Sequence, residues 1–197
     1  MADFVGGNPT WVKADDRHGH GTAVSELIRN LRPQADVVSV RVLDATLGGQ
    51  SHEILAAFAF CLSSSVTQFD LINASLSTQT ANTCQITLGR SLAFLLSLAA
   101  QSSGSVPVTV AAAGNTPTQQ YLGYPATMPD VQVALADDWN GRDAGYNVST
   151  TGHVLSTERA YGGIAGDPFG IIKRQGQPDE EIYGTSFAAA VVTASRA

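Results

Sequence analysis

The sequence is poor in cysteine, methionine, tryptophan and basic residues, and each shortage removes a class of function. Its 197 residues include 2 Cys, 2 Met and 2 Trp. Cys61 and Cys84 stand in unrelated contexts, so they indicate neither a disulfide framework nor a metal site, and we expect Cys61 to be a core residue of a helix. Lys and Arg number 11 against 17 Asp and Glu, for a net charge of −6, and no basic cluster occurs. A nucleic-acid partner is therefore not expected.

Long apolar runs are also missing. No run approaches the length that spans a bilayer, and the first residues lack the charged-then-apolar pattern of a signal peptide, so we expect no membrane partner and leave the compartment open. The chain is 44% hydrophobic and 14% charged, which suits one core of ordinary size. No repeat, linker or low-complexity tract divides it, so we expect a single domain over residues 1–197.

Hydrophobic periodicity alternates between helical and extended segments along the chain. Residues 1–16 read as an irregular segment with turns, and no core strand is expected there. The predicted helices cover residues 22–31, 51–62 and 88–99 and a last helix after Gly184, and the predicted strands cover 37–43, 69–74, 106–111, 131–136 and 152–155. Strands separated by helices of this length imply parallel crossovers. The sequence therefore predicts an α/β fold with a mainly parallel central sheet between two helix layers, αβα.

Three polar residues stand at loop positions where sites form in such folds. His20 begins the first predicted helix, Asn115 follows a buried strand, and Ser186 lies at the start of the last helix. Each alone has an ordinary explanation, as a satisfied helix-start histidine, a turn residue and a helix N-cap. Together they provide a base near neutral pH, a fixed amide donor for an oxyanion, and a hydroxyl nucleophile. One acyl-transfer site would use all three.

The sequences around these residues resemble the subtilisin-like serine proteases, in the family's order and over nearly the whole chain. The matching stretches are Gly19–Val24, Arg41–Asp44 with Gly48–Gln50, Asn73–Ser77, Ala111–Asn115, Tyr124–Ala126 with Pro129–Val131, and Gly184–Ala188. The resemblance implies a subtilisin-like fold and hydrolysis of peptide bonds through an acyl-enzyme. By resemblance, His20 is the general base and acid, Asn115 the oxyanion donor, and Ser186 the nucleophile.

The resemblance also implies how substrate binds. An extended polypeptide would pair as an added strand between two segments of the cleft, with a third forming a pocket wall. The residues concerned are Gly48, Gly49, Ser75, Leu76, Ser77, Ala112, Ala113 and Gly114. We expect no required cofactor and no metal in the catalytic site, while a structural calcium cannot be read from the sequence.

The chain departs from the family where the third member of the triad belongs. That aspartate stands in an Asp-Ser-Gly or Asp-Thr-Gly after the first core strand, and no such motif precedes His20. We interpret Asp15 and Asp16 as solvated turn acids and assign neither. Ala190 replaces the usual Pro, and Leu155–Glu158 replaces an Ala-Pro-Gly turn. We therefore expect a domain truncated at both ends relative to the family, weak or inactive alone, with open sheet edges that invite self-association.

Two other functions stay open. A non-catalytic module, or pseudoprotease, would use the same cleft to bind peptides or a partner without turnover. A Ser/His esterase on a different α/β fold is disfavoured, because Gly-x-Ser-x-Gly is missing and the His precedes the Ser. Of the remaining histidines, His18 is expected beside the cleft, while His52 and His153 are expected to be structural or solvated. Asn147–Ser149 fits a glycosylation triplet, which we interpret as an ordinary loop.

Overall fold

The computed structural model describes residues 2–6, 10–11, 15–62, 68–78, 83–103, 106–119, 121–148, 156–173 and 178–197. The elements in chain order are β1 (Ala2–Asp3), β2 (Thr10–Trp11), α1 (His20–Leu31), β3 (Val40–Arg41), α2 (Ser51–Leu62), β4 (Leu71–Ala74), α3 (Thr83–Ser103), β5 (Val108–Ala112), β6 (Val131–Asp137), β7 (Ser156–Tyr161), β8 (Gly170–Ile172), β9 (Glu180–Ile182) and α4 (Thr185–Arg196). None of the described helices is both long and apolar enough to cross a membrane.

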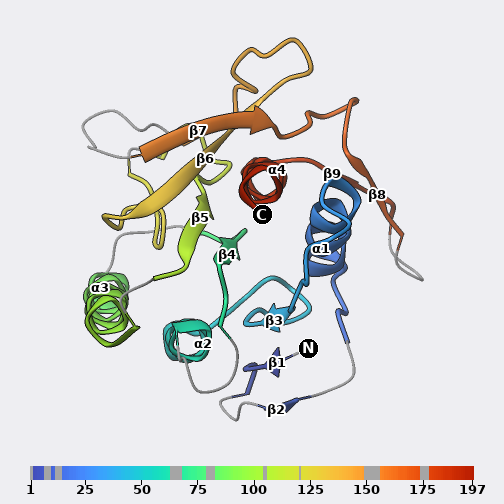
Figure 1. Cartoon of the computed structure of the whole chain (residues 1–197). Helices are drawn as coiled ribbons and strands as arrows, with labels where there is room; N and C mark the ends of the chain where they lie inside the picture. Colours follow the sequence, from blue (N-terminus) through green and yellow to red (C-terminus); the bar gives the residue numbers. More distant parts are fainter. Residues whose placement is uncertain are drawn as a thin grey trace.

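The central sheet holds four parallel strands in the order β4-β5-β6-β7 (Figure 1). Its register aligns Asn73 with Val110, and Val110 with Gln132. Helices α2 and α3 lie on one side of the sheet, and α4 and α1 lie on the other. The predicted α/β class with a mainly parallel sheet is therefore confirmed.

The two faces of the sheet differ in side-chain size, because successive residues of a strand point to opposite faces. Val131 and Val133 of β6 pack with the leucines of α3 and with Phe58 of α2. Ala134 and Ala136, on the other face, pack with Ala188 and Ala189 of α4, and Ala134, Ala188 and Ala189 are all fully buried. Small residues on both surfaces let α4 approach the strands closely. The helix that carries Ser186 is thus seated directly on the sheet.

The N-terminal segment corrects one prediction. Residues 1–16 were expected to be irregular, yet Ala2 and Asp3 form β1, which runs parallel to β3 and antiparallel to β2. Ala2 and Phe4 are buried against α2, and Arg41 donates hydrogen bonds to the Asp3 carboxylate. That hydrogen bond from Arg41 is the main reason why the pKa of Asp3 lies below its ordinary value. The strand β1 is only two residues long, which is too short to show a hydrophobic periodicity in the sequence.

The remaining elements agree with the prediction in place and differ in length. All four predicted helices are present, and Cys61 lies half-buried in α2, where burial raises the pKa of its thiol to about 11. The strand predicted over 37–43 is reduced to β3. The strand β7 and the β8-β9 hairpin were not predicted. The strand predicted over 152–155 lies outside the described residues.

Candidate active site

Ser186 is the second residue of α4 and is held at the helix start by a glycine. Gly184 has φ +134°, where L side chains are strained, and a Cβ there would lie 2.6 Å from the side-chain nitrogen of Asn115. Ser186 is half-buried between the buried Thr185 and Phe187. Its backbone N–H donates to no protein acceptor within the described part of the chain, as is usual in the first turn of a helix. The Ser186 hydroxyl and the Ser186 backbone N–H therefore lie together at the start of α4, and the N–H is available as a donor.

A chain of side-chain hydrogen bonds fixes the position of Ser186 against the end of β4. Thr193 Oγ1 donates to Asn73 Oδ1 over 3.0 Å, and Asn73 Nδ2 donates to Ser75 Oγ over 2.9 Å. Ser75 Oγ in turn donates to the carbonyl of Ser186 over 2.7 Å, and Ser186 Oγ donates to the carbonyl of Ser75 over 3.3 Å. Ser75, which was predicted to contact substrate, thus anchors the serine turn in this structure.

Thr185 fixes the side chain of Asn115, a role that the sequence did not reveal. The Thr185 N–H and Oγ1 donate to Asn115 Oδ1 over 2.9 and 2.8 Å, while Gly114 N–H donates to Thr185 Oγ1 over 3.0 Å. Because Oδ1 receives both bonds, the amide orientation is determined and Nδ2 is left as a donor. No described acceptor takes a hydrogen bond from it. Asn115 therefore has the property that an oxyanion donor needs, which is a fixed direction before substrate arrives.

Ser186 and Asn115 open into one small cavity of about 170 Å³. Ten residues line it: Leu76, Ser77, Thr78, Ala112, Gly114, Asn115, Thr116, Gln119, Thr185 and Ser186. Four of the predicted substrate-binding residues are in that lining, and Ala113 is fully buried behind it. Gly48 and Gly49 lie outside the lining, in an exposed loop whose turn is closed by the Asp44 carboxylate. Their contact with substrate stays a prediction.

His20 is the first residue of α1 and is placed there by Asp16. The Asp16 carboxylate accepts the N–H groups of Gly19 over 2.8 Å and of Thr22 over 2.6 Å, which caps the helix. Burial raises the pKa of Asp16, but these hydrogen bonds outweigh it and the net pKa is lowered. The interpretation of Asp16 as a solvated acid is wrong, since both carboxylate oxygens are engaged by the backbone. Asp15 is exposed and pairs with Arg17.

The surroundings of His20 favour its neutral form. The imidazole lies against the Phe187 ring, with centroids 5.8 Å apart, and near the His18 ring at 6.4 Å. Burial lowers the pKa of His20, and the charge of His18 lowers it further, while Asp16 and Glu180 act in the opposite direction and do not prevail. Within the described residues no carboxylate, and not Ser186, is hydrogen-bonded to the imidazole. The ring is ready to accept a proton but is oriented by packing alone.

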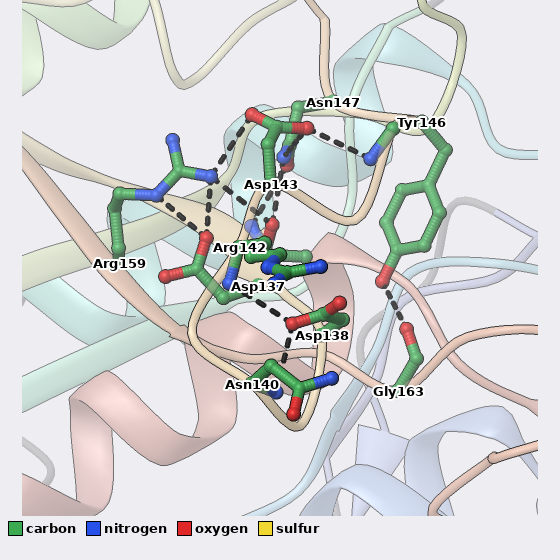
Figure 2. Close-up of polar contacts among 11 residues, drawn as sticks. Asp137, Asp138, Asn140, Arg142, Asp143, Tyr146, Asn147, Arg159 and Gly163 are labelled. Atoms are coloured by element: carbon green, nitrogen blue, oxygen red, sulfur yellow. Dashed lines mark hydrogen bonds and ion pairs between the residues drawn. The ribbon is translucent and has the colours of Figure 1, made fainter.

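The polar loop after β6 is organised separately from the site. Arg159 lies between the carboxylates of Asp137 and Asp143, and Asp138 accepts backbone N–H groups of its own loop (Figure 2). Asn147, part of the glycosylation triplet, bonds both backbone groups of Ala136. These contacts close a loop. Ser149 and His153 lie outside the described residues, and His52 lines a groove between α2 and α3.

The sequence and the fold were compared with known proteins. The model of the Subtilase family matches residues 5–197. The chain belongs to the subtilase family. As a solved structure, sphericase is similar to this subtilase, with a TM-score of 0.71 and 24% identity over 98% of the chain and 67% of sphericase. The prenylagaramide maturation protease PagA is also similar, with a TM-score of 0.68 and 19% identity over 94% of the chain and 64% of that protein. No curated protein sequence matches it.

These comparisons define the class of this subtilase. It spans about two thirds of the length of either solved structure, and at these identities the two structures show the shared fold. Family membership makes it a subtilisin-like serine peptidase by class. Among the residues that the structure describes, no three His, Cys, Asp or Glu side chains gather as metal ligands would. The expectation that no cofactor is needed stays a prediction.

Proposed function

We propose that this subtilase is a serine endopeptidase that hydrolyses peptide bonds through an acyl-enzyme on Ser186, with His20 as base and Asn115 as oxyanion donor. The observation that carries the proposal is the shared cavity: the Ser186 hydroxyl and the fixed Asn115 amide line the same hollow. The family match supports the reaction class. The substrate is an extended polypeptide, bound along Ser75–Ser77 and along the loop that holds Gly48 and Gly49.

The proposed reaction proceeds in two stages. His20 takes the proton of Ser186 Oγ as Oγ bonds to the carbonyl carbon of the substrate, and the resulting oxyanion is held by Asn115 Nδ2 and the Ser186 N–H. His20 then gives the proton to the leaving amine, and the peptide bond breaks to leave an ester on Ser186. In the second stage His20 takes a proton from a water as the water oxygen bonds to the ester carbon; the ester bond to Ser186 then breaks, His20 returns the proton to Ser186 Oγ, and the carboxylic acid leaves. Before attack, the Ser186 hydroxyl must leave the Ser75 carbonyl that it now bonds.

The same site explains why the 197-residue chain alone should be slow. The imidazole of His20 has no carboxylate partner among the described residues, and Asp16 is committed to capping α1. Loss of the triad aspartate in subtilisin lowers kcat by about 3 × 10⁴. We therefore expect residual activity at most from the chain by itself.

A non-catalytic binding module is the second candidate. The observation in its favour is that Ser186 Oγ and His20 are not hydrogen-bonded to each other, while Ser186 and Ser75 bond each other reciprocally. Such a module would use the same cavity and hold an extended peptide without cleaving it.

A fluorophosphonate probe tests the proposal, because it reacts with an activated serine and needs no knowledge of the substrate. Slow labelling of the purified chain should map to Ser186 by mass spectrometry and disappear in Ser186→Ala and His20→Ala. Ser195→Ala is the matched control, since Ser195 lies exposed at the far end of the same helix and should leave labelling unchanged. Labelling that persists in Ser186→Ala would contradict the assignment. Peptide binding without any labelling would favour the binding module.

A further inference from the structure

The ring of Phe187 lies against the imidazole of His20, and neither residue is among those that line the cavity with Ser186. The two centroids are 5.8 Å apart and the planes meet at 66°, an edge-to-face contact. Phe187 is 2% exposed and belongs to the core where α1 packs on α4, two helices that lie next to each other in Figure 1. It also follows Ser186 directly in the sequence. One residue therefore joins the helix of the proposed base to the helix of the proposed nucleophile.

Phe187 is itself held by further rings. Phe169 lies 5.6 Å from it, and Tyr161 lies 4.8 Å from Phe169, measured between ring centroids. The Tyr161 hydroxyl donates to the carbonyl of Asp167, which fixes the far end. We call Tyr161, Phe169 and Phe187 the aromatic stack. It ties β7, the segment before β8 and α4 to the first residue of α1.

The other ring described next to the imidazole is that of His18, with centroids 6.4 Å apart, and no described hydrogen bond fixes the direction of the imidazole. Three ionisable groups face His20: Asp16 from the preceding loop, His18 two residues before it, and Glu180 from β9. Asp16 caps α1 through backbone N–H groups, and Glu180 approaches His18 Nε2 at 4.0 Å. None of the three is hydrogen-bonded to His20 in the described structure. A ring contact constrains the imidazole plane and leaves its nitrogens available for proton transfer.

We propose that Phe187 is the positioning residue for His20, holding the imidazole at the start of α1 against α4, and that Phe169 and Tyr161 hold Phe187 in place. The proposal rests on the proposed function, in which His20 is the base. Loosening a catalytic group by about 1 Å can cost up to about a hundredfold in rate. The apolar contact also contributes to the burial that keeps the pKa of His20 low.

NMR of the His20 ring tests the proposal without requiring turnover. In the wild-type chain, the ring current of Phe187 should displace the carbon-bound proton resonances of the His20 ring, and nuclear Overhauser contacts should join the two rings. In Phe187→Leu, which removes the ring and keeps most of the bulk, that shift should vanish and the His20 pKa should rise toward 6.5 as water reaches the imidazole. Fluorophosphonate labelling should slow about ten- to a hundredfold. Phe94→Leu is the control, because Phe94 is an exposed phenylalanine on α3.

A second variant keeps the test decisive if Phe187→Leu does not fold. Phe169→Leu shortens the aromatic stack without touching His20 and should produce a smaller change of the same sign in both readouts. An unaltered His20 resonance and pKa in a folded Phe187→Leu would overturn the proposal, even if labelling slowed. Absence of the ring contact in the wild-type spectrum would overturn it as well. If labelling survives Ser186→Ala while the His20 readouts respond as expected, the proposed function fails and the positioning of His20 by Phe187 stands.

Discussion

Thr185 determines which polar atom of the Asn115 side chain is left to bond a substrate. It is 1% exposed, and its hydroxyl takes the Gly114 N–H while it gives its own proton to Asn115 Oδ1. An asparagine whose oxygen were free could turn its amide over and present an acceptor to a developing negative charge. Thr185 removes that choice, so the donor is directed before a substrate arrives. The residue before the proposed nucleophile therefore belongs to the machinery although it contacts no reacting atom.

Replacing Thr185 with Val should harm both stability and reactivity. The change leaves the Gly114 N–H without its acceptor, which costs about 1–3 kcal/mol of unfolding free energy. It also removes one of the two hydrogen bonds that hold Asn115 Oδ1 and leaves the one from the backbone N–H of residue 185. Labelling of Ser186 should therefore slow by about tenfold, less than the loss of 10²–10³ known for deleting an oxyanion donor. Urea unfolding and fluorophosphonate kinetics measure the two effects. Thr185→Ser keeps the hydroxyl and should preserve both, and equal behaviour of the two variants would refute the role.

Helix α1 depends on a cap that is supplied by Asp16, a residue outside the helix. Asp16 takes two N–H groups that would otherwise be unpaired at the helix start, and Gly19 has φ +96°, a conformation that glycine adopts without strain. The cap determines where the helix begins. Since His20 is the first residue of α1, the same two hydrogen bonds determine where its backbone lies at the start of the helix.

The variant Asp16→Ala should destabilise the protein by about 1 kcal/mol, the usual cost of losing a helix cap. Asp16→Asn retains an oxygen acceptor and should lose only a fraction of that amount. Urea unfolding near neutral pH compares the two. Because the pKa of folded Asp16 is lowered, the stability that Asp16→Ala loses relative to the wild type should be at its full value above the unfolded pKa near 3.8. That loss should shrink as the pH falls through the folded value. Equal stability of Asp16→Ala and the wild type would rule out the cap.

The sequence could predict residues whose signal is local. His20 and Ser186 open helices with clear periodicity, and Asn115 follows a buried strand, so position and residue type were enough. The roles of Thr185 and Phe187 were missed because they arise from partners 70 residues away in one case and on another helix in the other. A threonine or a phenylalanine near a serine carries no sign of such a partner.

Like the site residues, the helices and strands could be predicted where their signal is local in the sequence, and not where it depends on a distant partner. The strand β6 is almost wholly buried and reads as an apolar run. The strand β7, with the sequence Ser-Thr-Glu-Arg-Ala-Tyr, has no fully buried residue and no regular alternation of apolar and polar residues, so only its pairing with β6 makes it extended. The strand β1 is two residues long and exists because β3 offers it hydrogen bonds. Strands that form because a neighbouring strand pairs with them, and not because of their own residue preferences, leave no recognisable pattern in the sequence.

The strands of the described residues form separate sheets. The central sheet ends at β4, and the smaller sheet ends at β3, with no hydrogen bonds between the two among the described residues. Both strands therefore present an edge, which invites pairing with another chain or segment. The cavity with Ser186 lies beyond the carboxyl end of β4, where Ser75 follows the strand. A strand added at this edge would deliver its last residues near the site.

A strand supplied at that edge and ending in Asp-Ser-Gly should activate the protein. Fused upstream of the chain, it should speed the labelling of Ser186 on the order of 10³–10⁴-fold, the scale on which a carboxylate behind the base matters in serine peptidases. The same fusion ending in Asn-Ser-Gly fills the edge without the charge and is the matched control. Equal rates for the two fusions would show that the carboxylate does not act on His20. Sedimentation of both against the unfused chain would report whether the edge drives self-association.

The burial of α4 has a consequence for the order in which the molecule can be built. The helix packs on β4, β5, β6, β7 and α1, and eight of its twelve residues are buried. All of those partners precede it in the sequence, so a ribosome releases four strands and a helix before the piece that covers them. Until α4 leaves the ribosome, the alanine-lined face of the sheet remains exposed to solvent and to neighbouring chains. The central sheet can therefore close its alanine-lined face only after α4 has been made, and the proposed serine nucleophile is placed in the same step.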